Sequence, residues 1–223
     1  MTEYLLIAID SSSSMLARDF SPDRLESAKS AALSFINMVP KNTKIGIVSF
    51  AEDVKSGLHP TKDRRQLSQA IGAIKVSMTG GTNIGDALIK SANMLEQGGN
   101  KSVILLTDGQ SNFGTDVPYA IEYLKSKGVA VYAIGIATKE GGAVGNKFVS
   151  KLGTESISQI AEQTGGKYFF AEAGSSLDEN FRLIARLKKS DVSFDLSWIF
   201  LVFGLIFLIL EWFLASTKYK VIP

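Results

Sequence analysis

Short apolar runs recur along the chain and alternate with segments of helical periodicity. The runs YLLIAI (4–9), VILLT (103–107) and VAVYAIGIA (129–137) are apolar almost throughout, which is typical of strands buried on both faces. Between such runs lie amphipathic segments, the first of which follows Ser21, its expected N-cap, and ends before Pro40. Strands that alternate with helices form βαβ units. We therefore expect an α/β fold with a doubly wound, mostly parallel central sheet and helices on both faces.

The C-terminal segment 196–215 (LSWIFLVFGLIFLILEWFLA) is apolar apart from Glu211, and Trp198 and Trp212 lie near its two ends. Helical residues rise 1.5 Å each, so this segment would span about 30 Å, the thickness of a bilayer's hydrocarbon core. Aromatic residues are enriched at membrane interfaces. The sequence thus predicts one C-terminal transmembrane helix at 196–215. We expect the α/β domain over 1–189, a juxtamembrane linker over 190–195 and a short basic tail over 216–223.

Composition argues against several classes of function. The 24 Lys and Arg residues nearly balance the 22 Asp and Glu residues, for a net charge of +2, whereas a nucleic-acid-binding domain concentrates basic residues. The absence of cysteine excludes thiolate metal sites and disulfides, and the single histidine, His59, argues against zinc sites and histidine-dependent triads. Phosphate-binding and nucleophile-elbow glycine motifs are also absent. We expect no binding of nucleic acid and no enzymatic activity.

Three loops that follow expected strands carry oxygen-bearing side chains: 10–14 (DSSSS), 79–83 (TGGTN) and 107–109 (TDG). Each has an ordinary explanation when taken alone, since serine runs are common in loops, Thr82 fits as a helix cap, and Asp-Gly is a frequent turn. In open α/β sheets, however, such loops converge at the carboxyl ends of the strands. Hydroxyl and carboxylate oxygens are the ligands that Mg²⁺ prefers. Together the three loops predict a site for a hard divalent cation.

These stretches resemble the von Willebrand factor A (VWA) family and its metal-ion-dependent adhesion site (MIDAS). The resemblance rests on DSSSS (10–14), GTNIGDAL (81–88) and ILLTDG (104–109). It implies an intact site for Mg²⁺ or Mn²⁺, with a coordination position left for an acidic side chain of a protein partner. Its metal-binding residues would be Asp10, Ser12, Ser14, Thr82 and Asp108.

The residues beside these positions form the rim that a partner is expected to contact. They are Ser13, Asn83, Gln110, Asn112 and Phe113. Two other interpretations stay open: a metal-dependent phosphotransfer enzyme, and a structural VWA domain whose metal only stiffens the loops. The phosphotransfer chemistry uses a second Asp two residues after the first, and Ser12 occupies that position.

A longer resemblance points to a subgroup, the Bat-type membrane proteins associated with aerotolerance. It rests on SSSMLARDFSPDRLESAK (12–29), LLTDGQSNFGTD (105–116) and IAEQTGGKYFFA (160–171). Such proteins are commonly encoded alongside MoxR-type AAA+ ATPases. The resemblance therefore implies a MoxR-type ATPase, or another VWA membrane protein, as a partner.

The flanks of segment 196–215 bear on the side of the membrane that the α/β domain would occupy. The first residues of the chain lack the basic region and apolar core of a signal peptide. Basic residues are also more frequent before the segment than after it, which by the positive-inside rule favours a cytoplasmic domain with a C-terminal anchor. The Bat-type resemblance implies the opposite, an extracytoplasmic domain. The basic residues counted are Arg182, Arg186, Lys188 and Lys189 before the segment, and Lys218 and Lys220 after it.

Overall fold

A computed structural model describes residues 3–78, 81–95, 99–109, 111–138, 143–144, 147–148, 154–172, 174–190 and 197–216. The chain divides into two compact units, Met1–Arg186 and Leu187–Pro223. The first unit holds the central sheet and its helices, and the second holds the C-terminal helix.

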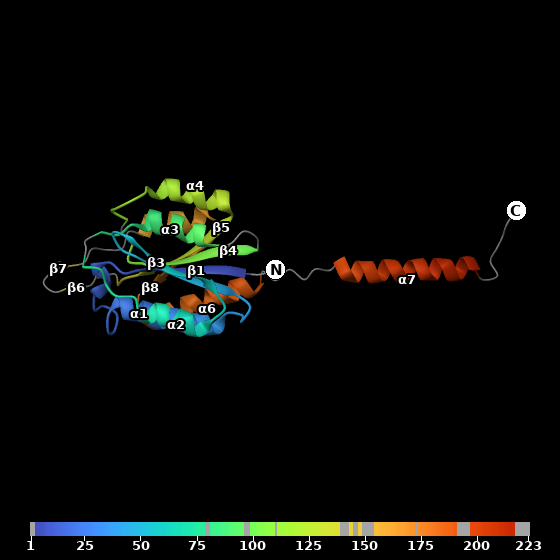
Figure 1. Cartoon of the computed structure of the whole chain (residues 1–223), viewed down its shortest axis with the longest axis horizontal. Coiled ribbons are helices and arrows are strands. Elements are labelled where there is room, and N and C mark those ends of the chain that lie inside the picture. The colour runs from blue at the N-terminus through green and yellow to red at the C-terminus, as the bar shows by residue number, and fades with distance from the viewer. Residues whose placement is uncertain are drawn as a thin grey trace. The chain divides into compact units, whose positions relative to one another are not determined.

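A six-stranded sheet in the order β3-β2-β1-β4-β5-β8 forms the centre of the first unit (Figure 1). All neighbouring strands are parallel except β2 and β3, which are antiparallel. This arrangement confirms the expected mostly parallel α/β fold. The strands are β1 (Glu3–Asp10), β2 (Lys44–Phe50), β3 (Val54–Thr61), β4 (Asn100–Thr107), β5 (Val129–Ile136) and β8 (Tyr168–Ala171).

Helices cover both faces of this sheet, α1, α2 and α6 on one and α3, α4 and α5 on the other (Figure 1). Alternate residues of β1 serve the two layers. Leu5 and Ile7 pack in the core under α1 and α6, while Leu6 and Ala8 pack under α3 and α4. The helices are α1 (Arg24–Met38), α2 (Arg64–Gly72), α3 (Ile84–Met94), α4 (Val117–Lys127), α5 (Thr154–Gln163) and α6 (Gly174–Ser190), and short elements are η1 (Ser13–Leu16), β6 (Ala143–Val144) and β7 (Lys147–Phe148).

Helix α1 begins later than the sequence suggested. Its N-cap is Asp23, not Ser21, and the Asp23 side chain accepts a hydrogen bond from the backbone N–H of Glu26. Aspartate and serine are both good N-caps, so residue type alone does not choose between them. The shift places Arg24 in the first turn of the helix.

The strand order reverses at β1, which has β2 on one side and β4 on the other. In open α/β sheets the loops that leave such neighbouring strands diverge to opposite faces and open a crevice at the carboxyl ends. The loops after β1 and β4 begin at Ser11 and Asp108. The fold therefore brings two of the three oxygen-rich loops to this crevice.

The second unit contains α7 (Ser197–Ser216). Within the part of the chain that the structure describes, no helix combines the length and the apolar character needed to cross a membrane. The prediction of a transmembrane helix at 196–215 is thus contradicted. The single-pass anchor and the cytoplasmic placement, which depended on it, are not retained.

Candidate metal site

Asp10 ends β1 and is fully buried. Its Oδ1 accepts a hydrogen bond from the backbone N–H of Ser12 at 2.8 Å, and its Oδ2 accepts one from the Thr107 hydroxyl at 2.7 Å. Thr107 Oγ1 in turn accepts from the backbone N–H of Gly109 at 3.1 Å. These bonds hold the Asp10 carboxylate between the loops that follow β1 and β4.

Asp108 follows β4 directly and is only 6% exposed. Burial raises the pKa of Asp108, although a hydrogen bond from Ser14 and the nearby charge of Arg24 offset part of this increase. Burial and the negative charge of Asp108 raise the pKa of Asp10 from 3.8 to about 7. The buried Asp108 carboxylate thus lies close enough to Asp10 to disfavour the ionisation of Asp10.

Ser12 and Ser14 add two hydroxyl groups to this pair. Their Oγ atoms lie 2.9 Å apart and share a hydrogen bond. Ser14 lies in the short helix η1, whose turn brings it back over Ser12, and it also hydrogen-bonds to Asp108. The D-x-S-x-S spacing therefore places Asp10, Ser12 and Ser14 around one region together with Asp108.

Thr82 lies on the neighbouring loop, just before α3, and is 5% exposed. Its backbone N–H donates to Asn112 Oδ1 at 2.8 Å, and its carbonyl accepts from the Asn112 backbone N–H at 3.1 Å. The loop is also tied to the end of β2, because the N–H of Asn83 donates to the carbonyl of Ala51 at 2.7 Å. Thr82 is therefore fixed to the loop that follows Asp108.

The donor set fits a hard divalent cation. A cation between the two buried carboxylates would offset the burial and the charge of Asp108 that raise the pKa of Asp10, and hydroxyl oxygens complete an all-oxygen environment. Among the described residues, no three His, Cys, Asp or Glu side chains gather as a metal-binding group. A cation here would therefore depend on hydroxyl oxygens as well as on Asp10 and Asp108, which is the chemistry of Mg²⁺ or Mn²⁺ rather than of a soft metal.

Arg24 is a member of the site that the sequence analysis did not identify. Its side chain is 0% exposed, and its Nη1 donates to Asp108 Oδ2 at 3.1 Å. Its Nε and Nη2 donate to the two carboxylate oxygens of Asp19 at 2.8 and 2.5 Å. A charged residue in the first turn of an amphipathic helix is normally solvated, so helical periodicity gave no sign of this contact.

Residues 5–110 match the family model of the von Willebrand factor type A domain. This match covers just under half of the chain, and we name the first unit the VWA domain for this similarity. The matched range includes the loops of Asp10, Thr82 and Asp108, and it ends before two of the five expected rim residues, Asn112 and Phe113.

Solved structures extend the similarity of this VWA domain beyond the matched range. An aerotolerance-related membrane protein from Bacteroides fragilis is 26% identical, with a TM-score of 0.73, over 82% of this chain and 98% of that one. BatB from Bacteroides thetaiotaomicron is 25% identical, with a TM-score of 0.70, over 84% and 99%. Both are similar to the first unit in sequence and in fold, so the Bat-type resemblance is confirmed.

Two further comparisons concern length and metal. A UPF0353 protein from Nocardia farcinica is 28% identical over 202 residues, which is 78% of this chain but 59% of that protein. The chain thus spans less than two thirds of that relative. Proximal thread matrix protein 1 from the mussel byssus, solved with a zinc-occupied MIDAS motif, shares the fold at 24% identity and a TM-score of 0.64, over 83% of this chain and 47% of that one.

The expected rim of the VWA domain is divided by the structure. Phe113 is 51% exposed and Asn112 is exposed, and both line a cavity of about 440 Å³ formed by residues 111–117. Asn83 is 5% exposed, and its side chain caps α3 by accepting from the backbone N–H of Asp86 at 3.0 Å. Ser13 is half-buried, and Gln110 lies outside the described residues. Asn112 and Phe113 are thus the rim residues that lie open beside the site.

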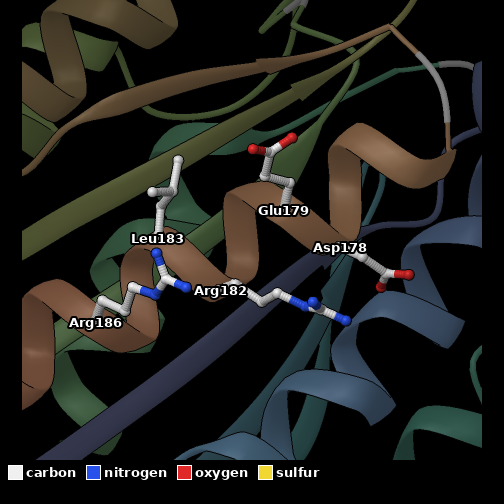
Figure 2. A pocket seen from close by; sticks show the side chains of 5 residues that line it. All are labelled: Asp178, Glu179, Arg182, Leu183 and Arg186. Atoms are coloured by element: carbon white, nitrogen blue, oxygen red, sulfur yellow. The ribbon is translucent and has the colours of Figure 1, made fainter.

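A second cavity of the VWA domain, of about 430 Å³, lies along α6 (Figure 2). It is lined by Asp178, Glu179, Arg182, Leu183 and Arg186, so two acidic side chains are followed along the helix by two basic ones. This mixture balances the charges of Arg182 and Arg186 and gives the cavity no single preference for an anion or a cation. It adds no residue to the candidate metal site.

Proposed function

We propose that the VWA domain of this chain is a non-catalytic protein-interaction module that binds an acidic side chain of a partner through a divalent cation, Mg²⁺ or Mn²⁺. The observation that carries the proposal is the buried pair Asp10 and Asp108, placed beside the Ser12 and Ser14 hydroxyls at the ends of β1 and β4. The zinc-occupied MIDAS motif of the mussel protein supports a metal at this place in the fold.

Each residue has a separate task in this proposal. Asp10 and Asp108 balance the charge of the cation, and Thr107 orients Asp10 through its hydroxyl. Ser12, Ser14 and Thr82 offer neutral oxygens, which leave the cation enough positive charge to attract a further carboxylate. A bound cation supplies a Lewis-acidic coordination position that the acidic side chain of the partner completes. Asn112 and Phe113 lie open beside it, where they contact the partner.

Cation binding is tested by calorimetric titration of the whole chain with Mg²⁺ and Mn²⁺ after treatment with a chelator. We expect binding by the wild type and an increase in melting temperature by mass action, since a ligand at 100 times its Kd stabilises by about 2.7 kcal/mol. Asp108→Asn should lose both effects. The matched control is Asp116→Asn, which removes an exposed carboxylate eight residues further along the chain. Equal binding by Asp108→Asn and the control would contradict the site.

Partner binding is tested by co-purification with a MoxR-type ATPase, and separately with a second VWA membrane protein, because the Bat-type similarity makes these the first candidates. We expect capture that requires Mg²⁺ and is lost with chelator or in Asp108→Asn. Phe113→Ala should keep cation affinity and weaken capture. Binding of the cation without any metal-dependent capture of these partners would favour a structural role for the metal.

A further inference from the structure

Arg24 carries a positive charge into the interior beside a proposed metal ligand. A fully buried guanidinium is costly unless carboxylates pair with it and its donors are satisfied. Arg24 meets this condition with two partners: Asp19, which receives two of its N–H groups, and Asp108, which receives one. The guanidinium of Arg24 is therefore held in a fixed position, and Asp108 is shared between Arg24 and the proposed metal site.

Asp19 is itself anchored to the sheet. Its Oδ2 accepts from the backbone N–H and from the hydroxyl of Thr138, both at 3.2 Å. Thr138 follows β5, so the chain of contacts runs from the end of β5 through Asp19 and Arg24 to Asp108 at the end of β4. Asp19 accepts two of these hydrogen bonds from the guanidinium and Asp108 accepts one, and this limits how strongly Arg24 is drawn to Asp108.

We propose that Arg24 is a positioning residue that sets the cation affinity of the site, and that Asp19 sets how much of its charge acts there. This inference rests on the proposed function, in which the site binds a dication. The network of Asp10, Asp19, Asp108 and Arg24 carries three negative charges and one positive charge, so a dication makes it neutral. Without Arg24 the loaded network would keep a negative charge, which would repel the carboxylate of a partner.

The charges predict opposite effects for two substitutions. Arg24→Gln removes the competing positive charge, so it should tighten binding of Mn²⁺. Asp19→Asn removes a negative charge and leaves Asp108 as the charged partner of Arg24. It should therefore weaken the binding of Mn²⁺. A charge beside a dication at low effective dielectric changes affinity on the order of ten- to a hundredfold. The double variant restores the original net charge and should bind Mn²⁺ within a few-fold of the wild type.

The experiment is a calorimetric titration of the whole chain with Mn²⁺ at pH 8, with circular dichroism to establish folding. Arg24→Lys is the fourth variant, because it keeps the charge and should stay close to wild-type affinity even if Arg24→Gln does not fold. Weaker binding in Asp19→Asn together with near-normal binding in Arg24→Lys supports the proposal.

Two outcomes overturn the inference while the proposed function stands. One is a wild type that binds Mn²⁺ while all four variants lose affinity to a similar extent, because a merely structural role would weaken them alike. The other is an Asp19→Asn variant that binds more tightly. If the wild type does not bind Mn²⁺, the proposed function itself is contradicted, and the inference fails with it.

Discussion

Replacement of Asp10 by asparagine tests whether this buried carboxylate is held in a site that costs stability in the absence of metal. The folded-state pKa of Asp10 is about 7, above the ordinary value of 3.8. Between these two pH values the folded chain binds the proton more tightly than the unfolded chain does, so stability is lost as pH rises through this window. Asp10→Asn does not titrate, and it should therefore become more stable than the metal-free wild type as pH rises.

The magnitude follows from the pKa and from the hydrogen bonds. A difference of about three pH units corresponds to about 4 kcal/mol at a pH above both values. The amide cannot accept from both Ser12 and Thr107 as the carboxylate does, and one lost hydrogen bond costs about 1 kcal/mol. We expect a net gain of about 2 to 3 kcal/mol at pH 8, which corresponds to an increase in melting temperature of about 5 to 10 °C for a domain of this size.

The assay is urea denaturation of the metal-free chain at several pH values from 5 to 8, with Asp116→Asn as the control. The difference in free energy of unfolding between Asp10→Asn and wild type should be near zero at pH 5 and should grow towards pH 8. The control difference should stay flat. An Asp10→Asn chain that is less stable than wild type across the whole range would refute the reasoning, because the carboxylate would then be a stabilising group.

Three further predictions concern the supports of the site and the core. Gly114→Ala should destabilise by about 2 kcal/mol in urea denaturation, because φ is +79° there and the new Cβ would lie 2.0 Å from Asn83 Oδ1; an unchanged midpoint would contradict the close approach. Phe181→Ala, buried 5.0 Å from the Phe35 ring, should cost about 3 to 5 kcal/mol without changing Mg²⁺ affinity by calorimetry. Thr107→Val should weaken Mg²⁺ binding about tenfold, the effect of about 1.4 kcal/mol, while Thr107→Ser retains it, since only the hydroxyl orients Asp10.

The sheet and most of its helices followed from the sequence because their signals are local. The apolar runs of β1, β4 and β5 are too uniform for half-exposed strands, and Gly128 lies where α4 ends. Gly128 ends that helix in a left-handed conformation, which glycine adopts without strain. The order of the strands in space placed the loops after β1 and β4 together, as expected for this class of fold.

The parts of the site that the sequence did not predict depend on tertiary contacts. Arg24 and Asp19 pair across a loop and meet Asp108, which is 84 residues from Arg24, and no spacing rule connects them. Asn83 was expected at the rim, but its side chain is used to cap α3. A polar side chain suits both a rim residue and a helix cap, and the direction in which α3 begins determines which of the two roles Asn83 takes.

The hydrogen bond between Thr107 and Asp10 joins residues 97 positions apart, and this separation has a consequence for biogenesis. A nascent chain cannot form the cation site until β4 and Asp108 have left the ribosome and β4 has paired with β1. Closing so long a segment is entropically slow compared with forming a local turn. Cation binding would therefore be possible only late in synthesis. A chain released before residue 108 would contain the serine loop but could not bind magnesium at this site.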